Sequence, residues 1–203
     1  MYKRPRYSTE IYDKIEKMDR GSVFSAVDFS DIAGVDAINQ ALSRLKAQGF
    51  IRRITQGIYD LPEYSELLKE YGSPRMDKVA TALARKYNWT IAPSGNTALN
   101  MLHLSTQVPN KWEYISDGPY RAYEIGKTRL EFKKRANKNT SGMSYLTVAV
   151  IEAIKAIGKS GVDSATIERL NKTLSDPEKK MILSESKTAT TWVYDIIKKI
   201  CEV

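Results

Sequence analysis

The sequence predicts an α+β protein, and three observations on its 203 residues support this prediction. Residues 25–62, SAVDFSDIAGVDAINQALSRLKAQGFIRRITQGIYDLP, indicate two short helices followed by a two-stranded hairpin. Three segments between residues 112 and 134, WEYIS, RAYEI and TRLEFKK, have the composition of strands and indicate a small antiparallel sheet. The last third of the chain has apolar residues at helical spacing. We therefore expect an N-terminal domain built from helices and a hairpin, followed by a mixed C-terminal domain.

The first short helix of residues 25–62 has clear start and stop signals. Ser25 is a good N-cap, and Asp28 stands three residues later, where it can close a capping box. Phe24 and Phe29 occupy the two positions of a hydrophobic staple. Gly34 can end the helix by supplying a left-handed residue. A preceding helix from about Thr9 to Met18 adds a third helix to this domain.

The second short helix and the hairpin complete the pattern. Asp36 can cap a helix that runs to Ala47, and its apolar residues fall on one stripe, namely Ile38, Ala41, Leu42 and Leu45. Gly49 stops the helix, and two strands then pair across Thr55-Gln56-Gly57, where Gly57 is free to take a positive φ. A polar helix face beside a basic hairpin is typical of a winged helix-turn-helix, which lays that helix in the major groove of DNA.

The predicted DNA-reading residues lie on the exposed face of the second helix and on the hairpin. Short amide and hydroxyl side chains suit base edges, whereas arginines reach bases or phosphates. The predicted set is Asn39, Gln40, Ser43, Arg44, Arg52, Arg53 and Gln56. The same arrangement of helices and hairpin also occurs as a protein-docking module, so a protein partner is the alternative.

Composition limits the other possibilities. The formal net charge of +8 favours an anionic partner, and double-stranded DNA fits that charge. The chain has one cysteine and one histidine, so we expect no disulfide, no metal site and a cytoplasmic location. No apolar run approaches the roughly 20 residues that span a bilayer, so no membrane partner is expected. Because no catalytic motif and no glycine-rich phosphate loop is present, we expect no enzyme activity and no cofactor.

We place a domain boundary in the polar stretch EYSELLKEYGS. It separates a winged helix-turn-helix domain at residues 1–62, a connector at 63–72 and a C-terminal α+β domain at 73–203. Ser73 and Pro74 mark the start of the next helix. In the C-terminal domain, residues 146–157 are apolar almost all round and predict a central buried helix.

Six basic residues lie between residues 127 and 138, where Glu131 is the one acidic residue. Alternation along TRLEFKK places Arg129, Glu131 and Lys133 on one face of a strand and Leu130 and Phe132 on the other. The predicted basic surface consists of Lys127, Arg129, Lys133, Lys134 and Arg135. It could hold phosphates or an acidic protein surface, or it could be a charged edge that resists aggregation.

Three segments resemble one known family: GFIRRITQGIYDLP, ALNMLHLSTQVPNKWEYISDG and the C-terminal WVYDIIKKI. They are similar to the AbiEi family of type IV antitoxins, and the resemblance covers nearly the whole chain. It implies the antitoxin of a bicistronic toxin–antitoxin system that acts in abortive infection. It also implies a winged helix that represses its own promoter, and a C-terminal domain that counters an AbiEii-like nucleotidyltransferase toxin. A stable complex with that toxin is not required in type IV systems.

Two alternatives remain open. Asp117 and the triplet Glu131-Phe132-Lys133 have the order of a restriction-type nuclease, in which two carboxylates hold Mg²⁺ and a lysine stabilises charge at the attacked phosphate. Asp117-Gly118-Pro119 is also ordinary turn chemistry. The second alternative is a stand-alone winged-helix transcriptional regulator.

Overall fold

The computed structural model describes residues 6–107, 109–134 and 142–202, and it confirms the α+β fold class. The chain divides into two compact units, Met1–Trp89 and Thr90–Val203, which are described separately below. Among the described residues, no helix combines the length and the apolar character that crossing a bilayer requires.

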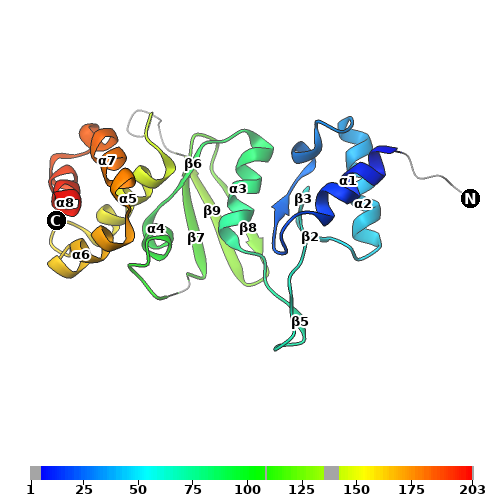
Figure 1. The fold of residues 1–203 in the computed structure, drawn as a ribbon, viewed down its shortest axis with the longest axis horizontal. Coiled ribbons are helices and arrows are strands. Elements are labelled where there is room, and N and C mark those ends of the chain that lie inside the picture. Colours follow the sequence, from blue (N-terminus) through cyan, green and yellow to red (C-terminus); the bar gives the residue numbers. More distant parts are fainter. Residues whose placement is uncertain (1–5, 108, 135–141, 203) are drawn as a thin grey trace, which may run out of the picture. The chain divides into compact units, whose positions relative to one another are not determined.

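The N-terminal unit begins with three helical segments and a small sheet (Figure 1). In chain order these are α1 (Arg6–Glu16), β1 (Val23–Phe24), the 3₁₀ helix η1 (Ala26–Phe29), α2 (Val35–Ala47), β2 (Arg52–Thr55) and β3 (Ile58–Asp60). The three strands form an antiparallel sheet in the order β1-β3-β2, so the strand that comes last in the chain lies in the centre. Their shared core consists of Ile11, Ile15, Phe24, Phe29, Ile38, Ala41, Leu42, Leu45, Ile51 and Leu61.

The predicted start of the first short helix is confirmed in detail. Ser25 and Asp28 form a capping box, and the Ser25 backbone N–H donates to the Asp28 carboxylate at 2.8 Å. The rings of Phe24 and Phe29 lie edge to face with centroids 5.6 Å apart, as a hydrophobic staple requires. The segment is a single 3₁₀ turn rather than a longer helix.

Residues 63–72, expected as a polar connector, contain a second hairpin. Strands β4 (Tyr64–Ser65) and β5 (Glu70–Tyr71) pair with each other and form a separate two-stranded sheet. The tight turn uses Lys69 at φ +50°, a conformation that glycine or asparagine usually supplies. The sequence therefore lacks the usual signal for this hairpin.

Helix α3 (Met76–Tyr87) belongs to the N-terminal compact unit, which therefore extends beyond the boundary predicted within residues 63–72. It contacts β1, β3 and η1. The Arg85 guanidinium donates to Asp28 at 2.7 Å and to the Val23 carbonyl at 3.1 Å. The Lys86 ammonium donates to the Gln56 carbonyl at 2.7 Å. These long-range bonds, rather than the composition of the connector, fix where the unit ends.

The C-terminal unit starts with a sheet and one helix: β6 (Ile91–Pro93), α4 (Gly95–Met101), β7 (Lys111–Ser116), β8 (Arg121–Ile125) and β9 (Thr128–Lys134). The strand order is β6-β7-β9-β8, and β7 runs parallel to β9. The expectation of an antiparallel sheet is therefore wrong for this central pair. The reason is that β8 and β9 form a tight hairpin across Gly126, and its second strand, not its first, pairs with β7.

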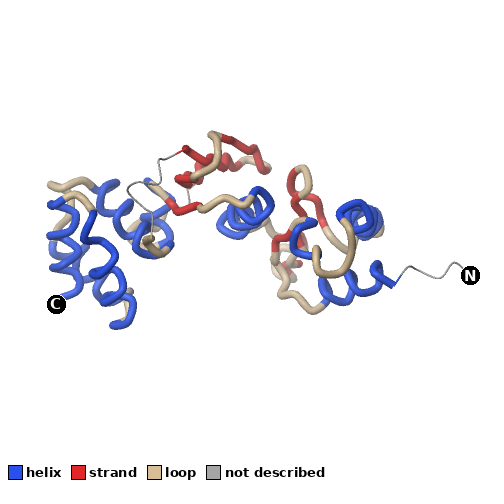
Figure 2. The backbone as a smooth tube through the Cα atoms, turned by 90° about the horizontal axis from the view of Figure 1, so that it is seen from above, coloured by secondary structure: helices blue, strands red, loops and turns tan. Residues whose placement is uncertain are grey.

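The rest of the C-terminal unit is helical, and its helices gather on one side of the strands (Figure 2). They are α5 (Tyr145–Ile157), α6 (Ser164–Thr173), α7 (Asp176–Glu185), the 3₁₀ helix η3 (Ser186–Thr188) and α8 (Thr191–Glu202). The predicted central helix is confirmed, because α5 has eight consecutive buried residues, 147–154. At its start the Glu185 carboxylate accepts 2.8 Å bonds from the Ser144 amide and hydroxyl, which ties α7 to α5.

Candidate nucleic-acid interface

Helix α2 has one buried apolar face and one exposed polar face. All four residues of the predicted apolar stripe are buried, with Ile38, Ala41 and Leu42 at 0 % exposure. The predicted base-reading residues Asn39, Gln40, Ser43 and Arg44 are all exposed. Within the described part of the chain these four side chains have no hydrogen-bond or ion-pair partner, so their polar groups are available to a ligand.

The turn between β2 and β3 is fixed in place by the neighbouring helix α3. Gly57 has φ +72°, and a Cβ atom there would lie 2.7 Å from the Lys86 Nζ. The ammonium can approach this closely because glycine has no side chain, and it bonds the Gln56 carbonyl beside it. Gln56 and Arg53 are exposed on this hairpin. The Arg53 Nε–H makes one long bond, of 3.4 Å, to the Thr55 carbonyl.

Arg52 differs from the other predicted DNA-reading residues. Its guanidinium holds the buried Asp60 carboxylate through two bonds of 3.1 and 2.6 Å and also donates to the Gly72 carbonyl at 2.9 Å. Asp60 is 1 % exposed, so its charge requires this partner. Arg52 therefore links β2, β3 and the base of the β4–β5 hairpin. Its guanidinium stabilises the fold of the N-terminal unit.

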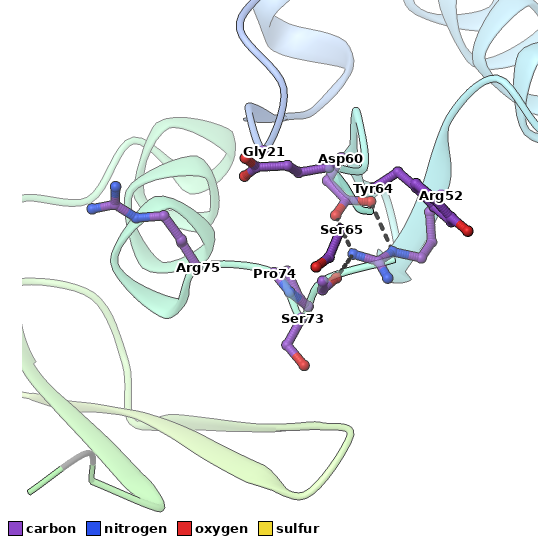
Figure 3. A pocket seen from close by; sticks show the side chains of 10 residues that line it. Gly21, Arg52, Asp60, Tyr64, Ser65, Ser73, Pro74 and Arg75 are labelled. Carbon is purple, nitrogen blue, oxygen red and sulfur yellow. Dashed lines mark hydrogen bonds and ion pairs between the residues drawn. The ribbon is translucent and has the colours of Figure 1, made fainter. Parts of the chain in front are cut away.

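A pocket of about 300 Å³ lies at the base of the β4–β5 hairpin (Figure 3). Figure 3 shows the Arg52 guanidinium directed at Asp60 on one side of it, with Ser73 and Pro74 below. Arg75 on the other side is paired with Asp77 at 2.7 Å. Because both arginines already have carboxylate partners, this pocket is not a free anion site.

In the C-terminal unit, a charge ladder covers one face of strands β7, β8 and β9. It consists of Lys111, Glu113, Glu124, Arg129, Glu131 and Lys133. Arg129 bonds Glu131 at 2.6 Å and Glu124 at 2.9 Å, and Lys133 lies 2.5 Å from Glu113. Leu130 and Phe132 are fully buried on the other face, as the alternation predicted.

Because of the charge ladder, the predicted basic surface carries less uncompensated positive charge than the sequence indicated. Lys127, Arg129, Lys133 and Lys134 are exposed, as expected. However, Arg129 and Lys133 are neutralised by carboxylates on the same face. Arg135 lies outside the described residues. Lys127 and Lys134 are the members of that prediction for which no such pairing is described.

The nuclease residues do not come together in one place. Glu131 lies opposite Glu113 in the parallel β7–β9 pair, whereas Asp117 follows the end of β7, four residues further along. At about 3.3 Å per residue this separates the levels of Asp117 and Glu131 by roughly 13 Å. Asp117 instead accepts a 2.8 Å bond from the Thr90 backbone N–H. Among the described residues, no cluster of three or more His, Cys, Asp or Glu side chains could hold a metal ion.

Neighbouring cations lower the pKa values of two carboxylates in the charge ladder, the buried Glu131 and the partly buried Glu113. For Glu131, the bond from Arg129 lowers the pKa, and this outweighs the opposing effect of burial. For Glu113, burial raises the pKa, but the bonds from Lys133 and Lys111 outweigh it and leave the pKa below its ordinary value. Both side chains are therefore carboxylates at neutral pH.

The lowered pKa values predict that the protein becomes less stable in acid. A carboxyl group whose pKa is lower in the folded state stabilises the fold above its ordinary value of 4.5 and loses this contribution as the pH falls through the folded pKa. Urea unfolding at about pH 6 and about pH 3 should show a smaller loss of stability for Glu131→Gln than for the wild type. An equal loss in both proteins would mean that Glu131 does not contribute.

The sequence analysis did not identify three residues that hold the elements around α2 and the β2–β3 hairpin in place through long-range bonds. Asp60, Arg85 and Lys86 each bond an element far from them in the sequence or across the sheet. No local motif marks such partners. The only available signal was that Asp60 stands in an otherwise apolar strand end, where a buried carboxylate needs a cation.

A family model described as a family of unknown function, DUF6088, matches residues 10–182, from within α1 into α7. No curated protein was found to match the chain.

Proposed function

The chain belongs to DUF6088, a family of unknown function, and we propose that it binds specific double-stranded DNA through its N-terminal unit. The observation that carries this proposal is the polar face of α2, where Asn39, Gln40, Ser43 and Arg44 are exposed above a fully buried stripe. Amide side chains of this kind make bidentate bonds to adenine, and arginine makes them to guanine.

The arrangement of elements supports the same proposal. The order α1-β1-η1-α2-β2-β3, with β3 between β1 and β2, is the order of elements in a winged helix. In such a domain α2 is the recognition helix, and the turn after β2 is the wing. Arg53 and Gln56 then occupy the wing, where phosphates or the minor groove lie. Arg52 leaves the proposed set because it is paired with Asp60.

We expect the protein to bind its own upstream region in preference to random duplex DNA. Replacing Asn39 and Gln40 by Ala should reduce the preference by roughly 1–3 kcal/mol per lost bidentate contact. Replacing Arg53 by Ala should weaken binding to all sequences and reduce the salt slope by about one. Fluorescence anisotropy with the two duplexes at several salt concentrations measures both effects.

Gln107→Ala is the matched control, since it removes an exposed amide in the C-terminal unit. It should leave both affinities unchanged. If the wild type binds the upstream fragment and a random duplex equally tightly, sequence-specific recognition by α2 is refuted.

The resemblance to AbiEi antitoxins supports a more specific role for the whole chain. In that role the N-terminal unit represses the promoter of the protein's own operon, and the C-terminal unit counters a nucleotidyltransferase toxin, with or without direct contact. A nucleotidyltransferase reading frame next to this gene would support the antitoxin role. An isolated gene would favour a stand-alone regulator instead.

A further inference from the structure

The β4–β5 hairpin gathers exposed apolar side chains in one place. Leu67 is 91 % exposed, Leu68 66 %, Tyr71 59 % and Tyr64 46 %. We call these four residues the apolar tip. The other large hydrophobic side chains that are exposed in the described ranges are separated in the sequence, namely Val27, Val35, Tyr120 and Tyr145. Single exposed apolar residues are common on proteins, but a contiguous group usually marks a binding surface.

Hydrogen bonds at its base stabilise the β4–β5 hairpin, in addition to the pairing of its two strands. The Gly72 backbone N–H donates to the Glu63 carbonyl at 2.9 Å, and Arg52 donates to the Gly72 carbonyl at 2.9 Å. Higher up, the rings of Tyr64 and Tyr71 lie edge to face at 5.3 Å. In Figure 1 the hairpin extends away from helices α1 and α2 of its own unit. The fold thus holds the two leucines at the end of an ordered arm.

The four residues of the turn, Glu66-Leu67-Leu68-Lys69, complement a second copy of themselves. In a two-fold interface, residue i contacts j and j contacts i. When this segment meets its copy in the opposite direction, Glu66 faces Lys69 at both ends, and Leu67 faces Leu68 in the middle. Charge and apolar character therefore match at every position.

From this self-complementarity we infer that the apolar tip is a homodimer contact, and that its partner is the apolar tip of a second copy of this chain. The two leucines of each copy are removed from solvent when the apolar tips meet. The two Glu66–Lys69 pairs fix the antiparallel orientation of the two turn segments. This inference does not depend on DNA binding, since it uses only residues 64–71.

Sedimentation equilibrium of the full chain over a wide concentration series tests this inference. The wild type should reach the mass of a dimer, and Leu67→Ser/Leu68→Ser should remain a monomer at the same concentrations. Glu66→Lys and Lys69→Glu should each raise the dimer Kd by about tenfold or more, because symmetry doubles each repulsion. The double variant Glu66→Lys/Lys69→Glu restores both pairs and should regain the wild-type Kd.

Val27→Ser is the control, because Val27 is a single exposed apolar residue on η1, and it should dimerise like the wild type. Circular dichroism should show unchanged melting for all variants, since substitutions at exposed positions cost at most about 0.5 kcal/mol. A wild type that stays monomeric throughout, or a double variant as weak as the single ones, would overturn the inference. A dimer that binds no DNA would refute the proposed function and leave this inference standing.

Discussion

A fragment that ends at Pro62 should be largely unfolded, whereas one that ends at Trp89 should fold and bind DNA. The shorter fragment lacks α3, which contacts β1, β3 and η1. It also lacks Arg85, the partner of Asp28, and Lys86, the partner of the Gln56 carbonyl. A domain of 62 residues has only about 3–9 kcal/mol of stability in total, so losing a packed helix removes most of it.

Thermal unfolding followed by circular dichroism compares the two fragments directly. The fragment 1–89 should show a cooperative transition, and Arg85→Ala in it should lower the melting temperature by several degrees without abolishing the transition. If residues 1–62 melt cooperatively at the same temperature as residues 1–89, then α3 is not part of the N-terminal fold.

Two adjacent arginines should give opposite results when each is replaced by alanine. Arg52→Ala should destabilise the protein by about 3–5 kcal/mol, because it leaves the buried Asp60 carboxylate without its partner. Arg53→Ala should cost no more than about 0.5 kcal/mol, because Arg53 is exposed and makes one long bond. Only Arg53→Ala should weaken DNA binding while the protein remains folded.

Urea unfolding of both variants, together with DNA titration under folding conditions, separates the two roles. Asp60→Asn in the Arg52→Ala background should recover part of the lost stability, since it removes the unpaired charge. The assignment is wrong if Arg52→Ala keeps wild-type stability and loses DNA affinity. Arg52 would then belong to the DNA surface, as the sequence first indicated.

Local signals predicted most of the local structure, although Gly34 has φ −69° and is itself the N-cap of α2, so the predictions of a left-handed Gly34 and of an Asp36 cap are wrong. The capping box at Ser25 and Asp28, the staple of Phe24 and Phe29 and the buried stripe of α2 are all confirmed. Alternation also placed Leu130 and Phe132 in the interior. These features depend on residues within about five positions of each other, where helix and strand geometry alone fixes which side chains meet.

Features that depend on distant partners could not be predicted in this way. The pair Arg52-Arg53 illustrates this, because strand alternation and a buried Asp60 on the next strand give the two arginines different surroundings. Likewise, Lys111 on β7 pairs with Glu131, and Glu113 on β7 pairs with Lys133, only because β7 lies beside β9. The linear sequence places these groups about 20 residues apart.

The sequence by itself determined the α+β class, the order of most helices and strands, and the polar face of α2. Those properties follow from side-chain periodicity and from capping residues, which act within one element. The tertiary structure decided where the N-terminal unit ends, which of the two arginines pairs with Asp60, and that β7 runs parallel to β9. These outcomes depend on which elements meet in space, because a salt bridge or a strand pair forms only when the fold brings both partners together.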